Sequence, residues 1–93
     1  MSDFRPLNTI LAAQVVLSPA SVAAATTVEQ MFTVTGCPSS AIAVFARLDT
    51  QPAGIALVGA RAVTDDTIGI EFVNDTAGAL VPTSGVYTIL LYR

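Results

Sequence analysis

From residue 12 onward, short stretches rich in Val, Ile, Thr and Phe alternate with turn-forming residues about every 8 to 14 positions. Short strands separated by such turns are typical of an antiparallel sandwich or barrel. The alternation predicts six strands, at about residues 12–17, 27–34, 41–48, 55–63, 67–73 and 86–92. We therefore expect an all-β fold, a small antiparallel β-sandwich or jelly-roll-like barrel of about six strands. The Ala-rich stretch 20–26 is too short for a stable helix and is predicted to be a loop.

Three of the predicted strands indicate which side chains point into the core, because successive strand residues face opposite sides. Over 67–73 the apolar set is Ile68, Ile70 and Phe72, and over 27–34 it is Val28, Phe32 and Val34. Strict alternation over 55–63 divides the strand into Ile55, Leu57, Gly59, Arg61 and Val63 on one side and Ala56, Val58, Ala60 and Ala62 on the other. Gly59 predicts a bulge or a close backbone approach in that strand.

The predicted strands at 41–48 and 86–92 are apolar on both faces over most of their length. A two-layer sandwich leaves one face of each strand in water, so this pattern predicts that the outward faces meet another subunit. The expected contact residues of a homo-oligomer are Ala43, Phe45, Val86, Leu90 and Tyr92. A closed barrel, with both faces partly covered by the N-terminal residues and loops, would explain the same pattern.

The first residues lack a period of either strand or helix, and Pro6 favours an extended backbone. We therefore predict an N-terminal arm over residues 1–11 and a single β-sandwich domain over 12–93. Phe4, Leu7 and Ile10 give the arm apolar side chains that favour docking onto another surface. A frayed terminus is the alternative.

The composition predicts that this chain associates with another protein surface rather than with a nucleic acid or an anionic membrane. Of 93 residues, 53% are hydrophobic and only 12% charged, and mean hydropathy is +0.67, so the apolar content exceeds what one small core can hide. The formal net charge is −3, and the four basic residues are scattered: Arg5, Arg47, Arg61 and Arg93. This distribution predicts neither a nucleic-acid partner nor an anionic membrane.

Catalytic chemistry has few candidates in this chain, which contains no His, Lys or Trp. Cys37, the only cysteine, lies in the turn sequence Gly36-Cys37-Pro38 without a His to activate it, so a buried thiol is expected rather than a nucleophile. The pair Asp65-Asp66 is interpreted as turn chemistry, and a weak Ca²⁺ site formed with Asp75 is the alternative. We expect no enzyme activity, and no catalytic, cofactor-binding or metal-binding residue.

Three segments resemble a known group of proteins: residues 26–36, residues 59–74, and the stretch from Thr76-Ala77-Gly78 through Pro82 to Gly85-Val86-Tyr87. They are similar to small virion proteins of tailed bacteriophages and look most like the capsid decoration, or cement, proteins. The resemblance covers about residues 17–92 and rests on turn, core and strand positions.

This resemblance implies a β-sandwich or jelly-roll-like module on the outside of an icosahedral capsid. Such modules commonly sit at threefold positions, often as trimers, and hold neighbouring capsid subunits together, although dimeric ones also occur. The implied partners are the major capsid protein and further copies of this chain, with no nucleic acid, membrane or cofactor. We predict that the arm supplies the capsid contacts, namely Phe4, Arg5, Leu7, Ile10 and Leu11.

The expected location is therefore the outer capsid surface of a virion, after synthesis in the host cytoplasm. The apolar run 10–17 faintly resembles a signal peptide, but it is short and the residues before it include Asp3 and no basic cluster. It is also shorter than the roughly 20 apolar residues that a transmembrane helix needs. The alternative function is a tail or fibre module that binds a host-surface glycan or protein.

Overall fold

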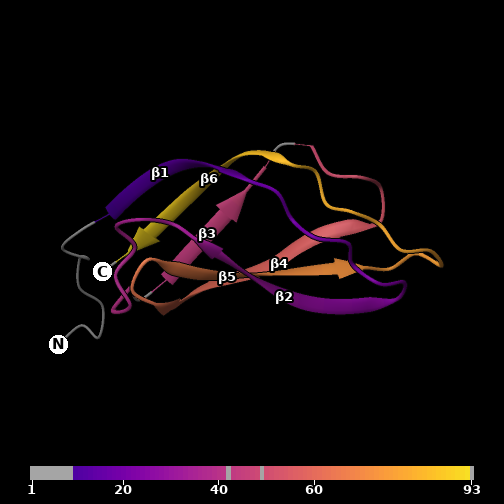
Figure 1. Cartoon of the computed structure of the whole chain (residues 1–93), viewed down its shortest axis with the longest axis horizontal. Helices are drawn as coiled ribbons and strands as arrows, with labels where there is room; N and C mark the ends of the chain where they lie inside the picture. Colours follow the sequence, from indigo (N-terminus) through magenta and orange to yellow (C-terminus); the bar gives the residue numbers. More distant parts are fainter. Residues whose placement is uncertain (1–9, 42, 49, 93) are drawn as a thin grey trace, which may run out of the picture.

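The computed structural model describes residues 10–41, 43–48 and 50–92. These residues form six strands and no helix (Figure 1): β1 (Ile10–Leu17), β2 (Thr26–Thr33), β3 (Ala43–Arg47), β4 (Ile55–Thr64), β5 (Thr67–Asn74) and β6 (Gly85–Tyr92). All six predicted strands are confirmed, with ends within two residues of the expected positions. The segment before β2 is a loop, as expected, and Val22 within it forms an isolated bridge with Leu80. No helix among the described residues is long and apolar enough to span a membrane.

All strand pairs are antiparallel, and they form one sheet in the order β1-β6-β3-β4-β5-β2. The sheet is weakest at its middle, because Val44 and Ala60 are the single residue pair in register between β3 and β4. There it folds over, so that the half made of β1, β6 and β3 lies against the half made of β4, β5 and β2 (Figure 1). β1 and β2 are the two ends of the strand order, so the described strands form an open, sandwich-like fold and not a closed barrel.

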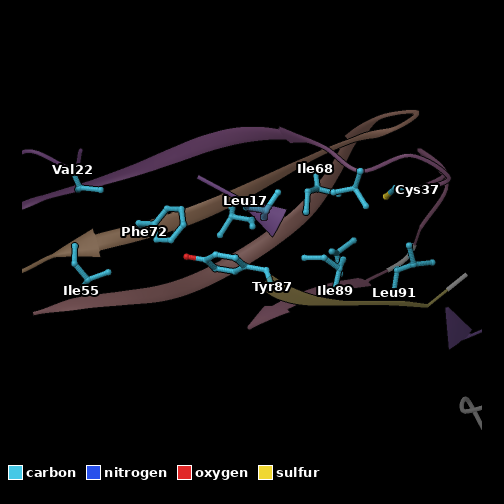
Figure 2. Close-up of a cluster of buried hydrophobic side chains, with 12 residues drawn as sticks. Leu17, Val22, Cys37, Ile55, Ile68, Phe72, Tyr87, Ile89 and Leu91 are labelled. Carbon is cyan, nitrogen blue, oxygen red and sulfur yellow. The ribbon is translucent and has the colours of Figure 1, made fainter. Parts of the chain in front are cut away.

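The core lies between these two halves. The middle strand of each half supplies a large share of it: Ile68, Ile70 and Phe72 of β5 and Tyr87, Ile89 and Leu91 of β6 are at most 5% exposed. Figure 2 shows Ile68 and Phe72 facing Tyr87 and Ile89 across the interior. The expected inward set of β5 is thereby confirmed. In β2, Phe32 is also inward and makes an edge-to-face contact with Phe72, with ring centroids 6.5 Å apart.

Strand β4 departs from the strict alternation predicted for it. The register with β5 shifts between Leu57 and Gly59, which confirms the bulge expected at this glycine. Beyond the bulge, Ala60 pairs with Ile70, on the core side, while Arg61 is exposed. The prediction that Arg61 shares a face with Ile55 and Leu57 is therefore wrong, because one extra residue in a bulge reverses the side chains that follow it, here as far as the second register shift between Ala62 and Thr64.

Two buried polar side chains hold the connecting loops against this core. The amide nitrogen of Asn74, which is 0% exposed, donates to the carbonyls of Val22 and Gly78, each at 3.0 Å. The Tyr87 hydroxyl donates to the Thr83 carbonyl at 2.7 Å and accepts from the Gln51 amide at 2.8 Å. A Tyr hydroxyl bonded to the backbone just upstream also occurs at strand corners of other β-sandwiches. These bonds fix the loops that precede β2, β4 and β6.

Candidate interaction face

The outer side of the β1, β6 and β3 half carries two groups of apolar side chains. The register places Val16 of β1 opposite Val86 of β6, and Leu90 of β6 between Ala12 of β1 and Phe45 of β3. Val16, Phe45 and Val86 are 72%, 58% and 50% exposed. We call the set Val16, Phe45, Val86, Leu90 and Tyr92 the apolar outer face.

The aromatic end of this face is ordered by packing between two strands. The rings of Phe45 and Tyr92 meet edge to face, with centroids 5.9 Å apart and an interplanar angle of 88°. A shallow groove of about 600 Å³ runs beside Phe45 and is lined by Val86 and Leu90 among other residues. The face is therefore a shaped surface with fixed side chains.

A polar row crosses the apolar outer face. Gln14 of β1 pairs with Thr88 of β6, and Thr88 pairs in turn with Arg47 of β3. All three residues line the same groove. A partner docked here would bury the apolar residues on both sides of the row and could hydrogen-bond to its members, as in the mixed surfaces of protein interfaces.

The outer side of the other half mixes apolar residues with an ion pair. Glu29 of β2 accepts two hydrogen bonds from the Arg61 guanidinium of β4, both at 2.8 Å. These bonds, more than the charge of Arg61, hold the pKa of Glu29 below its usual range, and the pKa of Arg61 is correspondingly raised. Met31 and Val58 are exposed apolar residues in this half, 52% and 55% exposed. The two sides of the fold thus differ in chemical character.

All five residues predicted for the oligomer contact lie on β3 and β6, which are neighbours in the sheet. Phe45 pairs with Leu90, which places both on the outward side, and Ala43 is in register with Tyr92. Val16 was missed by the sequence reasoning. Its exposure follows from the alternation in β1, but nothing local to the sequence indicates that β1 lies beside β6.

Of the residues predicted to contact a capsid, Phe4, Arg5 and Leu7 lie outside the described residues. Ile10 and Leu11, assigned to the arm by sequence, are the first two residues of β1. Leu11 pairs with Leu91 on the inner side, is 38% exposed, and lines a pocket of about 200 Å³.

The carboxylates of Asp65 and Asp66 hold one turn against another. Asp66 adopts a left-handed backbone with φ of 64° between β4 and β5, and its side chain accepts the Gly36 N–H at 2.7 Å. Asp65 accepts the Ser39 N–H at 2.8 Å, and this bond lowers the pKa of its carboxyl. The turn interpretation is confirmed, although the bonded amides belong to the β2–β3 connection rather than to the turn itself.

The Ca²⁺ alternative is wrong for geometric reasons. Asp75 follows the last residue of β5, whereas Asp66 precedes its first residue. An eight-residue strand spans about 25 Å, which is far beyond the reach of one ion's ligands. Among the residues that the structure describes, no group of three metal-ligating side chains comes together.

Cys37 is a buried thiol, as expected, with 3% exposure. Burial raises its pKa, and the negative charges of Asp66 and Asp65 raise it further. The sulfur is therefore protonated at neutral pH. It packs in the core cluster with Ile89 and Leu91 at the end of the fold opposite to Val22 (Figure 2).

No protein-family model, curated protein sequence or solved structure matches this chain.

Proposed function

We propose that this chain is a structural virion protein that decorates and stabilises the outside of an icosahedral phage capsid as a homo-oligomer. The observation that carries the proposal is the contrast between the two outer sides of the fold, one apolar and one ion-paired. The sequence resemblance to cement proteins supplies the kind of partner. It also implies a trimer as the expected assembly and the major capsid protein as the surface to which it attaches.

The apolar outer face is suited to a permanent contact. Exposed side chains such as Val16, Phe45 and Val86 gain about 25 cal/mol for each Å² of apolar surface removed from water. Clusters of exposed apolar side chains mark interaction sites in soluble proteins. We assign the face to contacts between copies, and residues 1–11 to the contact with the shell.

Stabilisation by such a protein requires no catalysis. A molecule that binds the assembled shell and not its dissociated subunits shifts the equilibrium towards the assembled state by mass action. Many copies on one shell add their separate binding free energies. A bridging module therefore raises the temperature at which the shell comes apart.

Co-sedimentation with capsids tests this proposal directly. The purified protein is mixed with mature, expanded capsids and with unexpanded precursors, and the pelleted shells are then heated. We expect saturable binding to expanded capsids and a higher disruption temperature. If neither capsid form binds the protein, the capsid role is refuted and a tail or fibre module binding host-surface glycan or protein takes its place.

The contact between copies is tested by Phe45→Asp, which places a charge at the centre of the apolar outer face. Phe45 is exposed, so the variant should fold normally and lose the association made through this face, which analytical ultracentrifugation would report as smaller assemblies than those of the natural chain. Thr27→Asp is the matched control, because Thr27 is exposed on the opposite outer side. An unchanged oligomer in Phe45→Asp would refute the assignment of this face.

A further inference from the structure

Within the part of the chain that the structure describes, the first strand is an unprotected edge of the sheet. β1 runs for eight residues in unbroken register with β6, and β6 is the strand that pairs with it among the described residues. Its sequence, ILAAQVVL, contains no charged residue and no proline. The backbone N–H and C=O groups on its far side are therefore positioned to pair with a further strand, because edges that stay unpaired usually carry charges, proline or bulges.

The opposite edge is protected by a charged residue and by a connecting segment. Strand β2 carries the charged Glu29, which is held in the ion pair with Arg61. The amide of Gln30 also bonds both backbone groups of Ala20, accepting its N–H at 2.7 Å and donating to its carbonyl at 2.8 Å. The segment before β2 is thereby tied to this edge.

Charge favours a second copy of this chain as the occupant of the β1 edge. Strands β1 and β6 have no charged residue, and β3 contributes only Arg47. The acidic residues of the described part lie in the other half or in its turns: Glu29, Asp65, Asp66, Glu71 and Asp75. As far as the described residues are concerned, two copies can approach edge to edge without opposed carboxylates, although each carries a formal net charge of −3.

The side chains of β1 are also complementary to themselves. An antiparallel pairing about a two-fold axis must keep inward residues opposite inward residues, because the pleat has a period of two. A register centred on Gln14 places Gln14 opposite its own copy and Ala12 opposite Val16 on the outer side. The inner side then pairs Ala13 with Val15. Small residues thus face larger ones, and the two central amides can bond to each other.

We propose that β1 of one copy pairs antiparallel with β1 of a second copy about a two-fold axis at Gln14, which extends the sheet across two molecules. The two apolar outer faces then adjoin in one surface. The proposal specifies self-association within the proposed function and rests on that function for its biological setting. A two-fold contact gives an even number of copies, whereas the trimer implied by the resemblance needs a different contact.

The size of the contact predicts a dissociable dimer. In this register residues 11–17 of each β1 are paired, and these seven residues form a strip about 24 Å long and, with side chains on both faces, about 10 Å thick. This strip covers about 240 Å² per partner, below the roughly 800 Å² typical of stable interfaces. We therefore expect the fraction of dimer to rise with protein concentration.

A variant of the full chain with one added cysteine tests the register. Gln14→Cys places an exposed thiol at the two-fold axis, and the native Cys37 is buried. Directly opposed residues of an antiparallel pair lie about 4.5–5.5 Å apart between Cα atoms, within the range of a disulfide. We expect rapid formation of a disulfide-linked dimer under mild oxidation. Thr27→Cys, exposed on the other edge strand, is the control, and equal cross-linking rates in the two variants would overturn the proposal.

A charge exchange at the same position gives a second, independent readout. Gln14→Lys and Gln14→Glu each oppose like charges at the axis, so each alone should dimerise roughly fivefold more weakly than the natural chain. An equimolar mixture should recover the dimer, because Lys then faces Glu. Failure of the mixture to recover, or a natural chain that is purely trimeric, would overturn the β1 contact. Neither result bears on co-sedimentation of the natural chain with capsids, which tests the proposed function separately.

Discussion

Glu29 and Arg61 form their bidentate ion pair across an intervening strand. Glu29 is on β2 and Arg61 on β4, and β5 lies between these strands in the sheet. The β5 residue beneath the pair is Gly69, which is in register with Arg61. A Cβ at Gly69 would lie 2.6 Å from the Glu29 carboxylate oxygen, so the absence of a side chain makes room for the ion pair.

Gly69→Ala should displace the carboxylate of Glu29 from Arg61. The end of the Glu29 side chain can move, so the variant should fold, but the two hydrogen bonds would weaken. We expect the pKa of Glu29 to rise towards its ordinary value, since the bonds from Arg61 are the main cause of its lowering. NMR titration of the carboxyl checks this. An unchanged pKa would mean that the strand moves to preserve the pair.

Protonation of two carboxylates should lower the free energy of unfolding in acid. The folded-state pKa values of Glu29 and Asp65 are lowered, by the bonds from Arg61 and from the Ser39 amide respectively. Their stabilisation is therefore present above the unfolded pKa and is lost as pH falls through the folded pKa, below about pH 5. Denaturant unfolding at a series of pH values should show that the free energy of unfolding falls less in acid for Glu29→Gln and for Asp65→Asn than for the natural chain.

Met31→Gln is the control for this loss of stability in acid. Met31 is the next outward position of β2 and is exposed, but it has no titrating group. Its variant should keep the full pH dependence of the natural chain. If Glu29→Gln and Asp65→Asn also keep it, the acid loss arises from other groups.

Asn74→Asp should destabilise the fold by about 3 kcal/mol or more at neutral pH. The Asn74 amide donates to two carbonyls in a fully buried position, and a carboxylate would set negative charge against both. Urea unfolding measures the loss. Asp75→Asn, at the exposed neighbouring position, is expected to change stability by less than about 0.5 kcal/mol. Equal effects would show that the Asn74 bonds contribute little.

Tyr87→Phe should cost about 1–2 kcal/mol, because it removes the hydroxyl that links Gln51 to the Thr83 carbonyl and keeps the ring. Thermal and urea unfolding would both report this loss. Tyr92→Phe makes the same chemical change at a partly exposed ring on the apolar outer face. It should leave stability nearly unchanged, and a larger effect at Tyr92 than at Tyr87 would contradict the role of the buried hydroxyl.

Removal of residues 2–9 should separate folding from attachment to a shell. Because β1 begins at Ile10, this deletion ends before the first strand pair with β6. Under the proposed function, we expect an unchanged unfolding temperature and loss of co-sedimentation with expanded capsids. Full binding by the shortened chain would assign the capsid contact to other residues.

Much of the fold follows from local pattern. The period of two places Ile68, Ile70 and Phe72 on one side of β5, and the structure buries all three. Turn residues mark the strand ends to within two positions, since Gly, Pro, Asn and Asp adopt turn conformations at low cost. Gly59 likewise indicates the bulge in β4, but not the side to which Arg61 turns after it.

The amino-acid sequence by itself determined the number, the limits and most inward faces of the strands, because these depend on side-chain alternation and turn chemistry within a few residues. Only the tertiary structure decided which strands are neighbours. The approach of Val16 to Val86, of Glu29 to Arg61 and of Asp66 to Gly36 joins residues at least 30 positions apart. Such contacts depend on strand order, which is decided by burial of the whole core and leaves no local periodic signal.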